Sequence, residues 1–217
     1  MPAATASPDL RESPHLAVRG LACRRGERLL FSAVDLSVEA GGIVWLRGAN
    51  GQGKTTLLRT LAGLSAPEAG TIAWADGAAP QRFVYIAHAN ALKDDLSAAE
   101  SLDFLLRLAG RVPTREQITA ALERFAMGSR RDAPVRTLSQ GQRRRVALAR
   151  RASETDASTW LHDEPFDALD AAGIETLNAL LAAHTKRGGS VVLTSHVALT
   201  TSDPMPTQIV LEAPLSA

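Results

Sequence analysis

The sequence predicts an α/β domain that combines a largely parallel sheet with an antiparallel β flank and an inserted α-helical subdomain. Short apolar runs alternate with longer helical patterns along the 217 residues, as in chains whose parallel strands are joined by helices. Between Leu96 and Arg151 the strand signals stop and helical signals replace them, which indicates the insertion. With 45% hydrophobic residues, the chain can bury one continuous core.

The strands are expected where short apolar runs lie between turn-forming residues. The first two of these runs and the fourth are expected to pair as the antiparallel flank. The expected strands are His15–Cys23, Leu29–Val38, Ile43–Arg47, Thr71–Trp74, Phe83–Ile86, Thr159–Asp163, Val191–Ser195 and Gln208–Leu211.

A helix is predicted directly after Gly53, with Leu57, Leu58 and Leu61 on one side and its end marked by Gly63.

Three capping boxes then predict the starts of further helices, because a Ser or Thr followed three residues later by Glu or Gln satisfies free backbone donors. These boxes are Ser97–Glu100, Thr114–Gln117 and Ser139–Gln142, and the last helix is expected to end near Arg151.

The domain organisation follows from these elements. Residues 1–14 carry prolines and charges without an apolar segment, unlike a secretory signal, so we expect a flexible N-terminal tail. Residues 15–217 are expected to form a single domain. Its α/β core would comprise residues 15–92 and 153–217, and its helical subdomain residues 93–152.

Composition excludes several classes of function. Lys+Arg total 24 and Asp+Glu 23, and the net charge of +1 provides no global positive field, so we expect no nucleic-acid partner. Cys23 is the only cysteine, which excludes an internal disulfide and a thiolate zinc cluster and agrees with the cytoplasm. The longest stretch free of charged residues, Gly188–Ser202, is too short and too polar to span a bilayer.

A phosphate-binding loop, GxxxxGK[ST], lies between the strand Ile43–Arg47 and the helix that follows. Its glycines allow backbone N–H groups to turn toward phosphate oxygens, its lysine supplies a positive charge and its threonine offers a magnesium ligand. The alternative, a glycine-rich turn with an incidental lysine, would not require every fixed position and both flanks to match. The predicted nucleotide-binding residues are Gly48, Ala49, Asn50, Gly51, Gln52, Gly53, Lys54, Thr55 and Thr56, with Thr55 also a metal ligand.

An apolar strand ends in two acidic residues, Asp163 and Glu164, followed by Pro165. At a strand end that faces a phosphate loop, Asp163 can hold Mg²⁺ while Glu164 aligns the attacking water. An exposed acidic turn is the alternative, but a phosphate loop requires a downstream carboxylate for its metal ion. The preceding His162 is expected to be structural.

The segment Leu138–Gln142 lies at a helix start, where free N–H groups and the Ser139 hydroxyl can bind a terminal phosphate. Together with the phosphate loop and the Asp-Glu-Pro strand end, in that order, it resembles the ATP-binding-cassette (ABC) ATPases from Leu16 to Leu211. The resemblance implies an ABC-type P-loop core that hydrolyses ATP with Mg²⁺. It also implies that Ser139, Gly141 and Gln142 contact a nucleotide held by a second copy of the chain.

Further positions match the family individually. The segment Phe166–Asp170 is similar to the D-loop at the subunit contact, with Asp170 as its informative residue. His196 is similar to the switch histidine that contacts the terminal phosphate and the catalytic glutamate, although a core histidine is the alternative. The resemblance therefore implies Glu164, His196 and Lys54 as the catalytic set.

The arginines of the helix predicted to start at Ser139 raise the question of a nucleic-acid-binding stripe. They are Arg143, Arg144, Arg145, Arg150 and Arg151. The near-zero net charge favours a solvated, ion-paired face instead.

Two departures from the family pattern concern the nucleotide pocket. Most cassettes have a glutamine where this chain has His88, and an aromatic residue near the position of Arg25. The flat guanidinium of Arg25 can stack on adenine. His88 can bind magnesium only through a neutral nitrogen, so either the magnesium shell differs or the link to the partner depends on pH.

One subfamily, the haem-exporter ATPases of cytochrome c maturation, is particularly similar. The features that match are His88, Lys93, the short chain and the segment Gly188–His196. The resemblance implies a peripheral subunit on the cytoplasmic face of the bacterial inner membrane, bound to integral membrane subunits, whose ATP turnover drives release of a haem-charged chaperone. No direct haem binding by this chain is expected.

Three alternatives remain open at this stage. The chain can instead serve an ABC exporter of a drug, a lipid or a metal. A non-transport clamp on DNA or ribosomes would need a second cassette, a long coiled-coil insertion or a basic surface. A phosphate-loop kinase or GTPase is opposed by the segment Leu138–Gln142 and by the absence of a guanine-reading motif.

Overall fold

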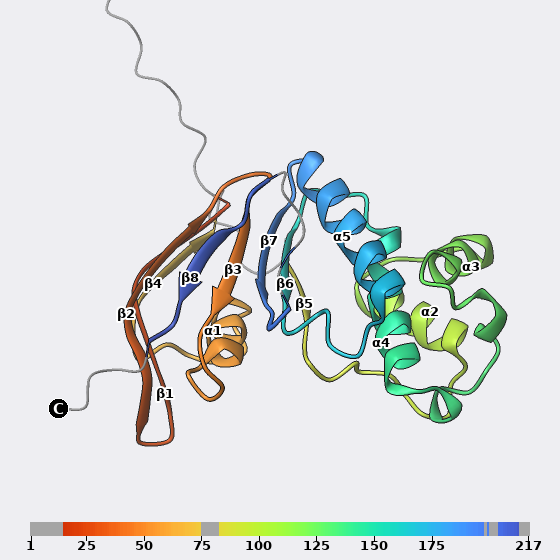
Figure 1. Cartoon of the computed structure of the whole chain (residues 1–217), viewed down its shortest axis with the longest axis horizontal. Helices are drawn as coiled ribbons and strands as arrows, with labels where there is room; N and C mark the ends of the chain where they lie inside the picture. Colours follow the sequence, from red (N-terminus) through yellow and green to blue (C-terminus); the bar gives the residue numbers. More distant parts are fainter. Residues whose placement is uncertain (1–14, 75–82, 198, 200–203, 213–217) are drawn as a thin grey trace, which may run out of the picture.

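The computed structural model describes residues 15–74, 83–197, 199 and 204–212, so the predicted tail at residues 1–14 lies outside the described part. Two sheets lie side by side in this part (Figure 1). A three-stranded antiparallel sheet has the order β2-β1-β4, and a five-stranded parallel sheet has the order β5-β6-β7-β3-β8. The strands are β1 (Leu16–Arg25), β2 (Arg28–Val38), β3 (Ile43–Arg47), β4 (Ala69–Trp74), β5 (Phe83–Ile86), β6 (Thr159–His162), β7 (Ser190–Thr194) and β8 (Thr207–Val210).

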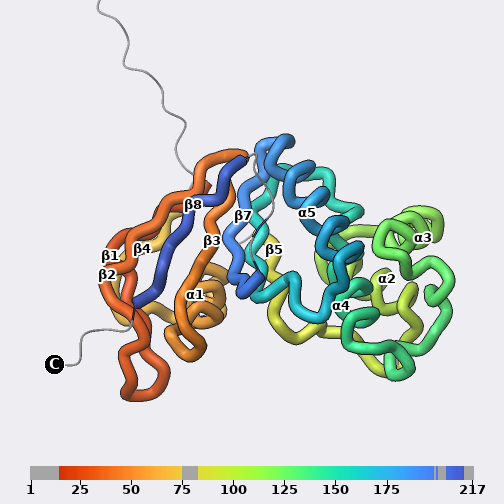
Figure 2. The backbone as a smooth tube through the Cα atoms, in the orientation of Figure 1, coloured from red at the N-terminus to blue at the C-terminus, as the bar shows by residue number. Residues whose placement is uncertain are grey.

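The predicted fold class is thereby confirmed, and every strand lies within a few residues of its expected position. The C-terminal strand β8 pairs with β3 although the two are far apart in the sequence, which Figure 2 shows along the backbone.

Three of the helices begin where the predicted capping boxes place them. Ser97, Thr114 and Ser139 each form the predicted reciprocal capping box, with both hydrogen bonds present. The helix α5 was not delimited from the sequence: it starts at the N-cap Asp170, which has a glycine three residues later and therefore no capping box. The helices are α1 (Lys54–Leu61), α2 (Ala98–Leu108), α3 (Arg115–Arg124), α4 (Gln140–Ala149) and α5 (Ala171–Lys186), with a 3-10 helix at Arg150–Ser153.

The core has two layers because side chains alternate between the faces of a strand. In β3, Ile43 and Trp45 face the α5 side, whereas Val44 and Leu46 face α1 and the antiparallel sheet. The helices α2, α3 and α4 lie together beyond α5 in Figure 1, and their apolar residues join the core layer on the α5 side. Among the described residues, no helix combines the length and the apolar composition that crossing a bilayer requires.

The parallel order of the central strands places the functional segments together. The strands β5, β6, β7 and β3 are neighbours, so the residues that follow their carboxyl ends meet at one edge of the sheet. This edge is the usual ligand position in open α/β sheets.

Candidate nucleotide-binding site

The phosphate loop leads from β3 into α1 and has a backbone that only glycine adopts easily. Gly53 has φ = 94°, and a Cβ there would lie 2.9 Å from the Phe31 ring. The Lys54 Nζ donates hydrogen bonds to the carbonyl oxygens of Gly48 (2.9 Å) and Ala49 (3.4 Å), so it lies folded over the loop. The first turn of α1 has neither a side-chain cap nor an acidic residue, which leaves its N–H groups available to phosphate oxygens.

A hydrogen-bond network joins the two predicted metal ligands, Thr55 in the first turn of α1 and Asp163 directly after β6. The Thr55 hydroxyl donates to Asp163 Oδ2 at 2.8 Å, and the Thr194 hydroxyl donates to Asp163 Oδ1 at 2.9 Å. Asp163 is 2% exposed.

The residues at this position fit Mg²⁺, which prefers oxygen ligands and retains several waters and phosphate oxygens in its shell. The described residues contain no cluster of three or more His, Cys, Asp or Glu that would form an all-protein metal cage. A magnesium ion at Thr55 and Asp163 would therefore share its shell with the nucleotide.

The predicted base Glu164 is held by backbone and side-chain contacts. Its N–H donates to Thr194 Oγ1 at 2.8 Å, and its Oε2 accepts from the N–H of His196 at 3.1 Å. The His196 Nε2 lies 3.4 Å from Glu164 Oε1, so the structure brings these two predicted catalytic residues together. Burial raises the pKa of the Glu164 carboxyl, the charge of His196 opposes this rise, and the charge of Asp167 adds to it.

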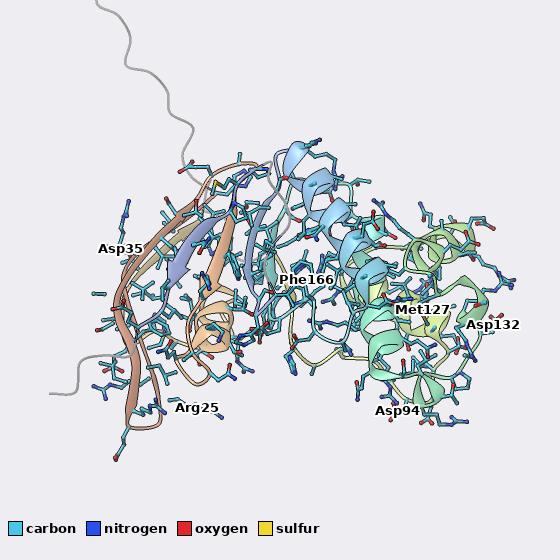
Figure 3. The ribbon with its side chains drawn as sticks, viewed as in Figure 1. Arg25, Asp35, Asp94, Met127, Asp132 and Phe166 are labelled. Carbon is cyan, nitrogen blue, oxygen red and sulfur yellow. The ribbon has the colours of Figure 1, made fainter. Side chains whose placement is uncertain are left out.

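A pocket of about 420 Å³ joins these groups to both residues that depart from the family pattern. His88 lies on its wall with Nδ1 3.7 Å from Asp167 Oδ2, and Arg25 lines it from the β1–β2 hairpin, where Figure 3 labels it. The full lining comprises Arg25, Leu30, Asn50, Gly51, Gly53, Lys54, Thr55, Thr56, His88, Glu164, Asp167 and His196.

The segment Leu138–Gln142, called the signature from here on, lies outside this lining. Ser139 caps α4, and its hydroxyl oxygen accepts from the Gln142 N–H at 3.2 Å, which leaves its own hydrogen free to donate. A Cβ at Gly141 would lie 2.6 Å from the carbonyl oxygen of Ala168, so this glycine allows α4 to approach the loop before α5. Asp170 caps α5 by accepting from the Gly173 N–H at 2.9 Å and also pairs with Arg145. The structure therefore does not bring Ser139, Gly141, Gln142 and Asp170 to the nucleotide pocket of their own chain.

The prediction of a solvated arginine face is wrong for two of its members. Arg144 is 2% exposed and Arg151 is 1% exposed, because the loops after β5 and β6 enclose the first and the Trp160 ring lies beside the second. Sequence reasoning also assigned no role to Asp167 or Thr194. Asp167 lies two residues after Pro165 and Thr194 lies two residues before His196, so closeness to these motifs was the available signal.

The arrangement can bind a triphosphate and activate a water molecule. Positive charge and free N–H groups lie at the loop, oxygen ligands for Mg²⁺ lie at the neighbouring strand ends, and a carboxylate of raised pKa faces the same pocket. These are the groups that phosphoryl transfer to water requires.

Comparison with known proteins agrees with this chemistry. The chain is 46% identical over 189 residues to the "Cytochrome c biogenesis ATP-binding export protein CcmA" of Pseudomonas putida KT2440, which covers 84% of this chain and 89% of the relative. It is 43% identical over 194 residues to the protein of the same name from Aromatoleum aromaticum, covering 86% and 91%.

Solved structures share the fold. A putative ABC transporter ATP-binding protein from Pyrococcus furiosus superposes with a TM-score of 0.78 at 24% identity, covering 90% of this chain and 96% of that one. An ATP-binding subunit of an ABC transporter gives 0.77 at 24% identity, covering 90% and 85%. The family described as ABC transporter matches residues 31–167. That match spans more than half of the chain, and the two relatives match more than four fifths of it. The chain therefore belongs to the ABC transporter family, as one of its ATP-binding proteins that hydrolyse ATP.

Proposed function

We propose that this chain is the ATP-hydrolysing subunit of the haem exporter complex of cytochrome c maturation. The observation that carries the ATPase role is that Lys54, Thr55, Glu164 and His196 line one pocket. Asp163 lies directly behind it, where it accepts a hydrogen bond from Thr55. The relatives named for cytochrome c biogenesis export support the choice of complex, since each covers more than four fifths of this chain.

In the proposed mechanism, each residue acts from its position in the structure. Lys54 leaves its carbonyl partners and neutralises phosphate charge, while the first-turn N–H groups of α1 hold phosphate oxygens. Thr55 and Asp163 would hold Mg²⁺, which would neutralise charge on the terminal phosphates. Glu164 accepts a hydrogen bond from the attacking water and orients it, and His196 supports the carboxylate and contacts the terminal phosphate.

The signature residues require a second copy of the chain. Ser139 does not line the pocket of its own chain, yet its capped helix start offers a hydroxyl donor suited to a terminal phosphate. A two-fold dimer would place the Ser139, Gly141 and Gln142 of each copy over the nucleotide of the other, with Asp170 near the contact. Hydrolysis would then remove the phosphate that joins the copies and open the dimer.

The proposed complex lies at the bacterial inner membrane. This chain would bind integral membrane subunits from the cytoplasmic face, and its helical subdomain, residues 93–152, would move relative to the α/β core during each cycle. The chain would bind no haem directly, and its net charge of +1 gives no global positive field for a nucleic acid.

Complementation tests this proposal. A strain that lacks the chain is supplied with the wild-type gene or with Glu164→Gln, and mature c-type cytochromes are measured by haem staining of gels. We expect maturation only with the wild-type gene, and a haem-loaded chaperone should accumulate without it. If maturation is normal in the deletion strain while export of a drug, a lipid or a metal is lost, the chain serves another ABC exporter.

A further inference from the structure

Arg144 is a buried arginine in the second turn of α4. Within the described part of the chain, its hydrogen bonds end on backbone carbonyl oxygens and on the side-chain amide of Asn90. Burial lowers the pKa of its guanidinium, whereas the charges of Asp167, Asp163 and Glu164 favour the charged form. The positive charge of Arg144 is thus stabilised by three carboxylates at the nucleotide site.

One side of the guanidinium holds the loop that carries the catalytic carboxylate. The Nη2 donates to the carbonyl oxygens of Asp163 at 3.0 Å and Glu164 at 2.6 Å, and the Nε donates to that of Pro165 at 3.3 Å. Glu164 has φ = 47°, a backbone conformation that is unfavourable for a non-glycine residue and persists only when its surroundings hold it. Arg144 supplies part of that support.

The other side of the guanidinium holds the segment that follows β5. The Nη1 donates to the carbonyl oxygens of Ala87 at 3.1 Å and His88 at 3.4 Å, and to Asn90 Oδ1 at 3.1 Å. The same segment places His88 on the wall of the pocket. A single side chain therefore joins the two segments that follow the neighbouring strands β5 and β6 at the nucleotide site.

The helix that carries Arg144 also carries the signature. Ser139 is the N-cap of α4, and Arg144 lies five residues further along the same short helix, so the two move as one rigid element. Arg144 makes no hydrogen bond to the phosphate loop in the described residues. Its contacts thus link the signature to the catalytic loop and to the His88 segment, separately from the groups that bind phosphate.

We propose that Arg144 is a positioning residue that couples α4 to Glu164 and His88, so that a shift of the signature helix moves the catalytic carboxylate. The planar fork of an arginine suits this role, because its donors point in several fixed directions at once. A lysine ammonium in the same place can reach one loop and cannot hold both. This inference rests on the ATPase role proposed for Glu164.

The test compares Arg144→Gln and Arg144→Lys with a buried arginine that lies away from the pocket. Arg151→Gln is the matched control, because Arg151 is 1% exposed, pairs with Glu154 and does not line the nucleotide pocket. All variants are expected to lose folding stability. Only the Arg144 variants should also lose about 10²-fold in kcat, the cost of misplacing a catalytic group by about 1 Å, with ATP affinity retained.

A double variant separates positioning from general damage. Once Glu164→Gln has removed the carboxylate, adding Arg144→Gln should lower kcat no further, because residues that act as one unit are not additive. If the double variant instead lost kcat by the product of the two single-variant losses, the proposal would be overturned. Full turnover in Arg144→Lys, or an equal loss of kcat in Arg151→Gln, would also overturn it. Normal turnover in the Arg144 variants beside an inactive Glu164→Gln refutes this inference alone. Retained turnover in Glu164→Gln refutes the proposed catalytic role as well.

Discussion

The Thr194 hydroxyl is a buried link between the metal ligand and the catalytic base, so Thr194→Val is a stringent test of the site. This side chain is 0% exposed. Its hydroxyl oxygen accepts from the Glu164 N–H at 2.8 Å, and its O–H donates to Asp163 Oδ1 at 2.9 Å. Valine has nearly the same shape but can do neither.

The expected cost follows from these two hydrogen bonds. A buried donor left without a partner costs about 1–3 kcal/mol, and a hydrogen bond to a charged group contributes about 1.5–3 kcal/mol. Asp163 keeps its bond from Thr55, so we expect the free energy of unfolding to fall by about 3 kcal/mol in total. For a chain of this length, that corresponds to a fall in Tm of roughly 6–12 °C.

The assay combines urea unfolding, followed by tryptophan fluorescence, with steady-state ATP hydrolysis. Turnover should fall by about 10²-fold, because the Glu164 backbone loses a support beside its strained φ. The control is Thr185→Val, a threonine 4% exposed whose hydroxyl donates only to Ala182 within its own helix. Losing this hydrogen bond should lower the free energy of unfolding by at most about 1.5 kcal/mol and leave turnover unchanged. If both variants behaved alike, the reasoning about Thr194 would be refuted.

Two further predictions concern catalysis and the pH dependence of stability. Glu164→Gln should lower turnover by roughly 10²–10⁴-fold, the range for a positioned base, while equilibrium binding of ATP persists; a variant that still turns over would remove Glu164 from this role. Burial lowers the pKa of His184 from 6.5 to about 4, so the unfolded chain binds more protons than the folded one between these values, and stability falls as the pH drops through this window. His184→Gln should flatten that dependence in urea unfolding at pH 5 and pH 7, and equal slopes in both proteins would contradict it.

Local signals in the sequence sufficed for much of the fold. The three capping boxes predicted the starts of α2, α3 and α4 because capping depends on residues three apart, and alternating apolar runs predicted the strands. The phosphate loop could be found in the same way, since its function requires fixed residues at fixed spacing. The start of α5 could not be predicted in this way, because its N-cap, Asp170, has no glutamate or glutamine three residues later.

The sequence by itself determined which residue types the site contains, because each motif is a short run of neighbours. Only the tertiary structure decided which of them meet. Thr55 contacts Asp163 across 108 residues because β3 and β6 end at the same edge of the sheet. Arg144 looked like one of several solvated arginines, and it is buried because loops distant in sequence close around it. Burial and long-range contact depend on how elements pack together, and no local pattern of residues encodes that packing.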